Sequence, residues 1–125
     1  MKITIATGIL FAFISILFGA LGSHAIKATL MERQMVESFQ IARDFTMYHG
    51  LALILLGILM HLFPEIKFSY VAIAFVLGSV LFQGVIFVKS FVDVGKLGIL
   101  NPVGGSILFL GWIFFFYLVI RFIKW

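Results

Sequence analysis

The chain divides into four long uncharged runs that are separated by short charged segments. The runs cover residues 3–22, 47–63, 68–88 and 103–120, and they are 20, 17, 21 and 18 residues long. At a rise of about 1.5 Å per residue, roughly 20 helical residues cross the hydrocarbon core of a bilayer, which is about 30 Å thick. All nine Lys and Arg residues and all five Asp and Glu residues lie between the runs or at their ends. The pattern predicts four membrane-spanning helices.

The continuity of the runs predicts an all-α fold. Within lipid, only helices and closed barrels satisfy all of their backbone polar groups. Barrel strands would give alternating segments of about ten residues, whereas these runs are uninterrupted. We therefore predict an integral membrane four-helix bundle that forms a single domain over residues 1–125, with an amphipathic helical segment between the first and second spans.

The segment between the first two runs has a helical periodicity of its own. Over residues 30–46, apolar side chains recur on one face, and polar or charged side chains occupy the opposite face. Thr29 and Glu32 fit a capping box at its start. We expect an amphipathic helix over 30–46 that either lies on the membrane surface or leads directly into the second span. Asn101 and Pro102 similarly predict the N-cap and first position of the fourth helix.

Small residues mark the faces on which helices are expected to pack. In the first span they recur at steps of three and four residues, which puts them on one stripe where two backbones can approach closely in lipid. Glycines near the start of the fourth span favour close contact in the same way. The expected packing residues are Gly8, Ala12, Ser15, Gly19, Gly22, Ser23, Gly104, Gly105 and Gly111.

Composition narrows the function classes. Hydrophobic residues make up 63% of the chain and charged residues 11%, whereas soluble proteins have roughly 45–50% and 25%. The absence of cysteine excludes disulfides, thiolate metal sites and cysteine nucleophiles. The net charge of +4 comes from scattered basic residues, so we expect contact with anionic lipid headgroups and not with nucleic acid. No nucleophile and base are paired at a suggestive spacing, and we expect no enzyme, cofactor or metal.

Successive spans cross the membrane in opposite directions. The ends of spans one and three and the starts of spans two and four therefore lie at one membrane face, together with the polar residues near them. Histidine titrates near neutrality, and ionisable groups at membrane depth are often functional. The two histidines there could join span one to span two by a hydrogen bond, handle protons or a ligand, or bind a metal or haem. Gln83 could bond to another helix or line a pathway. The candidate polar cluster comprises His24, Asp44, Tyr48, His49, Gln83 and Asn101.

Several motifs resemble a known family when they are taken together. They are Gly19-Ala-Leu-Gly-Ser-His-Ala25, Met47-Tyr48-His49, Pro102-Val-Gly-Gly105 and Gly111-Trp112. Their order and spacing resemble domain-of-unknown-function family 423, the small four-helix membrane proteins that include the transmembrane protein 256-like group. The resemblance implies a multi-pass protein with both termini in the cytoplasm, and it implies no reaction. Phe82-Gln83-Gly84 departs from the family pattern, in which serine often precedes the glycine.

These observations favour a non-enzymatic protein of the cell membrane. We expect it to bind a lipid, a small ligand, another membrane protein or a second copy of itself. The alternative is a small transporter or channel with a polar path near Gln83, His24 and His49. Four spans leave little room for a pore within one bundle, so this alternative requires an oligomer.

Overall fold

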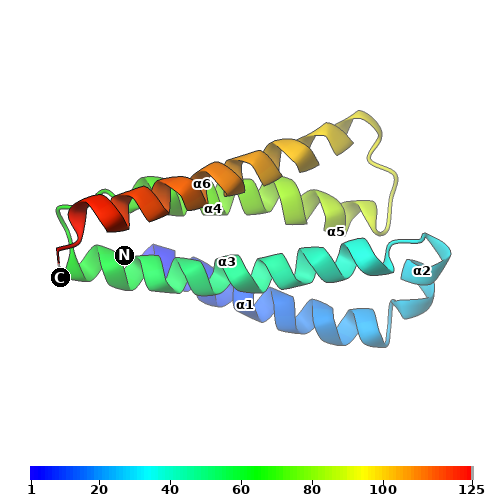
Figure 1. The fold of residues 1–125 in the computed structure, drawn as a ribbon. Helices are drawn as coiled ribbons and strands as arrows, with labels where there is room; N and C mark the ends of the chain where they lie inside the picture. Colours follow the sequence, from blue (N-terminus) through cyan, green and yellow to red (C-terminus); the bar gives the residue numbers. More distant parts are fainter. Residues whose placement is uncertain (125) are drawn as a thin grey trace.

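The computed structural model describes residues 1–124, which fold into helices joined by short connections (Figure 1). These residues contain no strand. Four helical stretches are long and apolar enough to cross a membrane, as the sequence predicted. The elements are α1 (Lys2–Ser23), α2 (Lys27–Glu32), α3 (Val36–Leu62), α4 (Ser69–Ser79), a π-helical turn (Val80–Gly84), α5 (Val85–Lys89), a 3-10 helix (Gly95–Ile99) and α6 (Leu100–Phe122).

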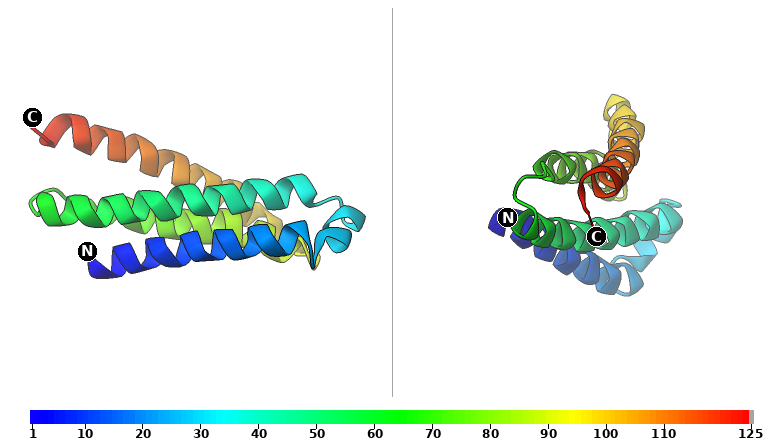
Figure 2. Two further views of the ribbon diagram at one scale, coloured as in Figure 1. Left: turned by 90° about the horizontal axis from the view of Figure 1, so that it is seen from below. Right: turned by 60° about the vertical axis from the view of Figure 1, so that its left-hand side comes forward.

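The long helices form two antiparallel pairs. α1 packs along α3, and α4 packs along α6 (Figures 1 and 2). α3 also contacts α4 and thereby joins the two pairs. Both chain termini lie at one end of the bundle, here called the termini end, and α2 lies at the other, the α2 end.

Glycines on both partners let α1 and α3 approach closely. A Cβ atom on Gly8 would lie 2.5 Å from the carbonyl oxygen of Gly50, and one on Gly50 would lie 2.9 Å from that of Gly8. Farther along α1, the Ser15 hydroxyl donates to the Arg43 carbonyl of α3 at 2.8 Å. Lipid tails are as apolar as the side chains they meet, so close backbone contact and hydrogen bonds hold such helices together.

Other small residues of the first span face α3 as well. A Cβ on Gly19 would lie 3.2 Å from the Arg43 side chain, and one on Gly22 would lie 2.8 Å from the Phe39 ring. Ser23 instead is exposed and donates to the Gly19 carbonyl within its own helix. The glycine side of α1 is thus the side that α3 covers.

The second pair uses the same device. A Cβ on Gly104 of α6 would lie 2.8 Å from the Gly78 carbonyl oxygen of α4. Gly111 faces Phe75, whose ring would lie 3.0 Å from an added Cβ, and Gly105 is in ordinary contact with Phe82. The apolar core between the pairs includes Leu53, Leu56, Phe68, Val71, Phe75 and Phe115.

The helix that we predicted over residues 30–46 is divided in two. α2 ends at Glu32, and Gln34 has a left-handed backbone with φ of 55°. The Gln34 N–H donates to the Met31 carbonyl and the Met35 N–H to the Leu30 carbonyl. These two hydrogen bonds together form a Schellman motif, which ends a helix. Glycine usually takes the left-handed position of this motif. Because this segment has no glycine, we wrongly predicted one continuous helix over 30–46.

The start of α3 shows how the segment connects to the second span. α3 begins at Val36 and runs unbroken into the second span, with Phe39 and Ala42 buried in the bundle. It therefore leads into the span, which was one of the two alternatives. The capping box is wrong, because α2 begins at Lys27, ahead of Thr29.

The fourth span also begins earlier than predicted. The 3-10 helix Gly95–Ile99 runs into α6 at Leu100, so Asn101 is inside the helix and is not its N-cap. Pro102 is the third residue of α6, still within the first turn, where a missing N–H costs nothing. The Asn101 side chain is therefore available for a contact outside its own helix.

Adding a methyl group to Gly8 should separate α1 from α3. We expect Gly8→Ala to lower the free energy of unfolding by about 1–3 kcal/mol, because the new Cβ would overlap the Gly50 carbonyl. Unfolding in mixed detergent micelles measures this. Gly84→Ala is the matched control, since a Cβ there meets no atom of residues 1–124 within 4 Å. Equal stability of the two variants would contradict glycine-mediated packing.

Candidate functional site

His49 is buried in α3, and both of its ring nitrogens are occupied. Its Nδ1 lies 2.8 Å from the Phe45 carbonyl oxygen, and its Nε2 lies 3.1 Å from Nε1 of Trp112 on α6. An indole N–H can only donate a hydrogen bond, so Nε2 must accept. The ring proton is then on Nδ1 and is donated to Phe45. The two bonds together require a neutral imidazole in one defined tautomer.

This arrangement makes His49 a link between helices. The Trp112 N–H occupies the lone pair that a metal ion or a transferred proton would need, and Phe75 packs edge-on against the imidazole at 5.2 Å. The hydrogen bond joins the second span to the fourth. Our expectation of a histidine bond between the first and second spans is therefore wrong for His49; the pairing depends on helix rotations that periodicity does not fix.

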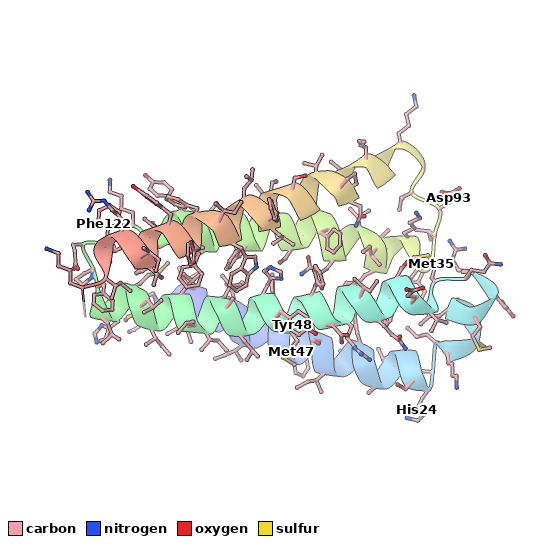
Figure 3. All side chains as sticks on the ribbon, in the orientation of Figure 1. His24, Met35, Met47, Tyr48, Asp93 and Phe122 are labelled. Atoms are coloured by element: carbon pink, nitrogen blue, oxygen red, sulfur yellow. The ribbon has the colours of Figure 1, made fainter. Side chains whose placement is uncertain are left out.

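Among the other candidates on the first two spans, Tyr48 lines a cavity of about 530 Å³ together with His49, whereas His24 and Asp44 do not line it. His24 is exposed where α1 ends, and it points away from the bundle at the α2 end (Figure 3). Asp44 pairs with its neighbour Arg43 at 2.8 Å, as surface charge would. Tyr48 is 57% exposed and packs beside Phe45. The predicted cluster is thus dispersed over several surfaces.

Gln83 is the candidate with the most unusual surroundings. It is only 2% exposed and lies in the π-helical turn Val80–Gly84 of the third span. Its Nε2 donates to the Ser79 hydroxyl at 3.2 Å, within the same span, so the expected bond to another helix is not formed. Its Oε1 is buried without a hydrogen-bond partner among residues 1–124. π-helical turns often occur at functional sites.

Asn101 supports this turn from the neighbouring helix. Its Nδ2 donates to the Phe82 carbonyl oxygen at 2.9 Å, which ties α6 to the π-helical turn next to Gln83. The Asn-Pro pair predicted that Asn101 caps its own helix, whereas its side chain instead bonds to the neighbouring span. Asn101 thus contacts the turn that contains Gln83.

Gln83 lines a cavity of about 280 Å³ that α1 and α3 complete with Phe11, Phe18 and Thr46. A second cavity of about 520 Å³ follows along the same helices toward the termini end. Val80 lines both cavities, so we treat them as one α1–α4 groove. No Asp, Glu, Lys or Arg side chain of residues 1–124 lines either part. The groove is apolar, and the Gln83 amide beside it is almost fully covered.

The geometry limits the chemistry of the candidates. Gln83 faces the groove, His49 faces α6, and His24 is exposed at the α2 end, so one chain does not align them along one path. Within residues 1–124, no three His, Asp or Glu side chains are placed to hold a metal ion. What the described residues offer is an enclosed polar atom in an apolar groove.

Comparison with known proteins identifies the family. The family described as "Protein of unknown function (DUF423)" matches residues 18–105, well over half of the chain. The chain belongs to this family. A UPF0382 membrane protein of Staphylococcus haemolyticus is 30% identical over 113 residues, which cover 90% of this chain and 91% of the relative. UPF0382 membrane proteins of Staphylococcus epidermidis and Staphylococcus aureus are 29% and 27% identical over the same coverage.

No solved structure matches the chain with significance. The DUF423 match and the four apolar helices agree that the chain is an integral membrane protein. The match includes Gln83, His49 and Asn101, whereas Phe11 and Trp112 lie outside it. The family description gives no reaction or ligand, so function has to be argued from the groove and its lining.

The link between His49 and Trp112 should appear as an energetic coupling. We expect a double-mutant cycle of His49→Leu and Trp112→Phe to give a coupling of about 0.5–1.5 kcal/mol in unfolding free energy, the range for hydrogen bonds between helices in lipid. The free energy of unfolding in mixed micelles is measured for the parent chain, the two single variants and the double variant. A cycle of His24→Ala with Trp112→Phe is the control and should be additive. Additivity in both cycles would refute the bond.

Proposed function

We propose that this DUF423 protein is a non-enzymatic binding module that takes a lipid from the bilayer into its α1–α4 groove. The observation that carries the proposal is the groove itself, two consecutive cavities of about 280 and 520 Å³ along the seam between the helix pairs. Binding sites for small molecules are typically apolar clefts of about 300–1,000 Å³ with a few polar groups. The groove has this size and this lining.

The fate of the polar side chains supports a binding role over catalysis. His49, the buried histidine, uses both ring nitrogens in hydrogen bonds, and the Asp44 carboxylate is paired with Arg43. Neither is free to act as a general base next to the groove, and neither lines it. The Ser15 and Thr46 hydroxyls donate to backbone carbonyls. These polar side chains are thus already engaged in hydrogen bonds or an ion pair within the protein.

Filling the groove should abolish lipid retention. Gly84 lines the cavity, and a side chain there would point into open space, so Gly84→Leu should occupy the groove without displacing helices. We expect one lipid species to co-purify with the gently solubilised protein and to fall at least five-fold in Gly84→Leu. Mass spectrometry of the bound lipids measures this.

The control for this experiment is Gly98→Leu, on the 3-10 helix outside the groove, where an added Cβ would have a single contact, 3.9 Å from Val94. It should retain the lipid of the parent chain. Identical lipid contents in the parent chain, Gly84→Leu and Gly98→Leu would contradict the proposal. Co-purification of one partner protein with all three chains, and of no lipid, would contradict it as well.

We also propose that the protein lies in the cell membrane with both termini in the cytoplasm. The basic residues Lys2, Lys67, Arg121 and Lys124 belong to the termini end, close to helix boundaries, where the positive-inside rule counts them. The α2 end carries a similar number, so charge alone is balanced. The resemblance to family members with more basic loops favours cytoplasmic termini.

Orientation can be tested directly because the chain has no cysteine. Asp93→Cys, on the loop between α5 and α6, should react with a membrane-impermeant maleimide in intact cells. Lys67→Cys, in the turn between α3 and α4, should react only after the cells are opened, since it lies at the termini end. Labelling of Lys67→Cys alone in intact cells would reverse the proposed orientation.

A further inference from the structure

We propose that the α1–α4 groove selects a neutral long-chain lipid with a free hydroxyl group, and that the Gln83 amide recognises this hydroxyl. The inference rests on the proposed function and adds the chemical class of the ligand. It is carried by three observations: the unpartnered Gln83 Oε1, the lack of charged side chains in the lining, and the shape of the groove.

The first observation is an acceptor without a donor. Gln83 is 98% enclosed, with a carbonyl oxygen that no group of residues 1–124 satisfies. Inside a membrane there is no bulk water to replace the missing partner, and each unsatisfied group there is costly. Side chains that carry such a cost are conspicuous, since buried polar groups are nearly always paired. A ligand hydroxyl in the cavity would remove the cost once the Gln83 side chain turns its covered amide toward it.

The hydrogen bond between Gln83 and Ser79 indicates that the donor on the ligand is a hydroxyl group. The amide nitrogen bonds to the Ser79 hydroxyl, which can itself either donate or accept. Rotation of the amide by half a turn would keep the Ser79 bond and expose the nitrogen in place of the oxygen. A hydroxyl can donate to Oε1 or accept from Nε2, so it suits both orientations. A ketone or an ether suits only one of them.

The lining excludes a charged headgroup. No charged side chain of the described residues lines either cavity, and the N-terminal residue Met1 lines only the part near the termini end, so a phosphate or carboxylate beside Gln83 would be buried without a counter-charge. Burying an unpaired ion costs far more than one hydrogen bond returns. The ligand that fits is therefore neutral at the end that reaches Gln83.

The shape of the groove sets the direction and length of the ligand. The Phe18 and Phe87 rings meet edge-on with centroids 4.6 Å apart and flank the cavity on the side of the α2 end. From Gln83 the groove continues to Ser69 near the termini end, a helical distance of about 21 Å. A long unbranched chain fits this path, with its hydroxyl beside Gln83. We therefore assign the site to a long-chain alcohol or a similar hydroxyl lipid.

The test compares two photoreactive probes on the purified protein in nanodiscs. One is hexadecanol with a diazirine near the end of its chain, and the other is hexadecane with the same diazirine, which can neither donate nor accept a hydrogen bond. We expect the alcohol to label groove residues of α1 or α4 at least about five-fold more than the alkane, the factor expected for one hydrogen bond. Excess unlabelled hexadecanol should compete.

Variants then assign the preference to Gln83. Gln83→Met should label equally with both probes, and its thermal midpoint without ligand should rise because the unpaired oxygen is gone. Ser90→Ala is the matched control, since its buried hydroxyl bonds to the Ile86 carbonyl and does not line the groove. It should keep the preference for the alcohol.

The outcomes separate the two proposals. Equal labelling of the parent chain by both probes within the groove would overturn hydroxyl selection and leave lipid binding in place. A preference for the alcohol that survives in Gln83→Met would overturn the role of Gln83. Labelling by both probes only outside α1 and α4, unchanged in Gly84→Leu, would overturn the groove as a binding site altogether. The parent-chain comparison needs no variant, so it is decisive even if Gln83→Met fails to fold.

Discussion

The absence of water from the bilayer core is the constraint on which the rest of this structure depends. A polar atom there has to find its partner inside the protein. Thr46 and Ser90 donate to carbonyls four residues back in their own spans, whereas Ser15 and Asn101 donate to carbonyls of a neighbouring helix. The same requirement pairs the His49 ring with α6. Against this background, one unsatisfied oxygen in the described residues is exceptional.

The contacts within each helix pair differ from those between the pairs. Each pair is closed by glycines that bring two backbones together, at Gly8 with Gly50 and at Gly78 with Gly104. Between the pairs, the seam of α3 with α6 carries the His49 bond and a cavity of about 530 Å³, while the seam of α1 with α4 contains the groove. Both seams therefore leave open space beside closely packed pairs, and the His49 bond crosses the seam of α3 with α6.

Fold class was predictable because hydropathy and charge act along the chain, one residue at a time. The four uncharged runs fall within the four long helices except for Phe63 and Phe68, which lie one residue outside them. The break at Gln34 was not predictable, since a residue other than glycine takes the left-handed position and a local hydrogen-bond motif supports it. The pairing of His49 with Trp112, 63 residues away, depends on how two helices are rotated, which periodicity leaves open. Gln83 was recognisable as unusual, but its π-helical turn and its missing partner were not.

The open groove has a consequence for how any occupant would be supplied. A lipid that enters from the side leaves neighbours as apolar as the Phe and Val side chains it meets, so burial of its chain contributes almost nothing to selection. Under the proposed function, discrimination would come from the single polar contact, and exchange would proceed by lateral diffusion within the bilayer. Occupancy would follow the mole fraction of the ligand among membrane lipids, and its concentration in water would have no bearing. A protein that worked in this way would respond to the composition of the membrane in which it lies.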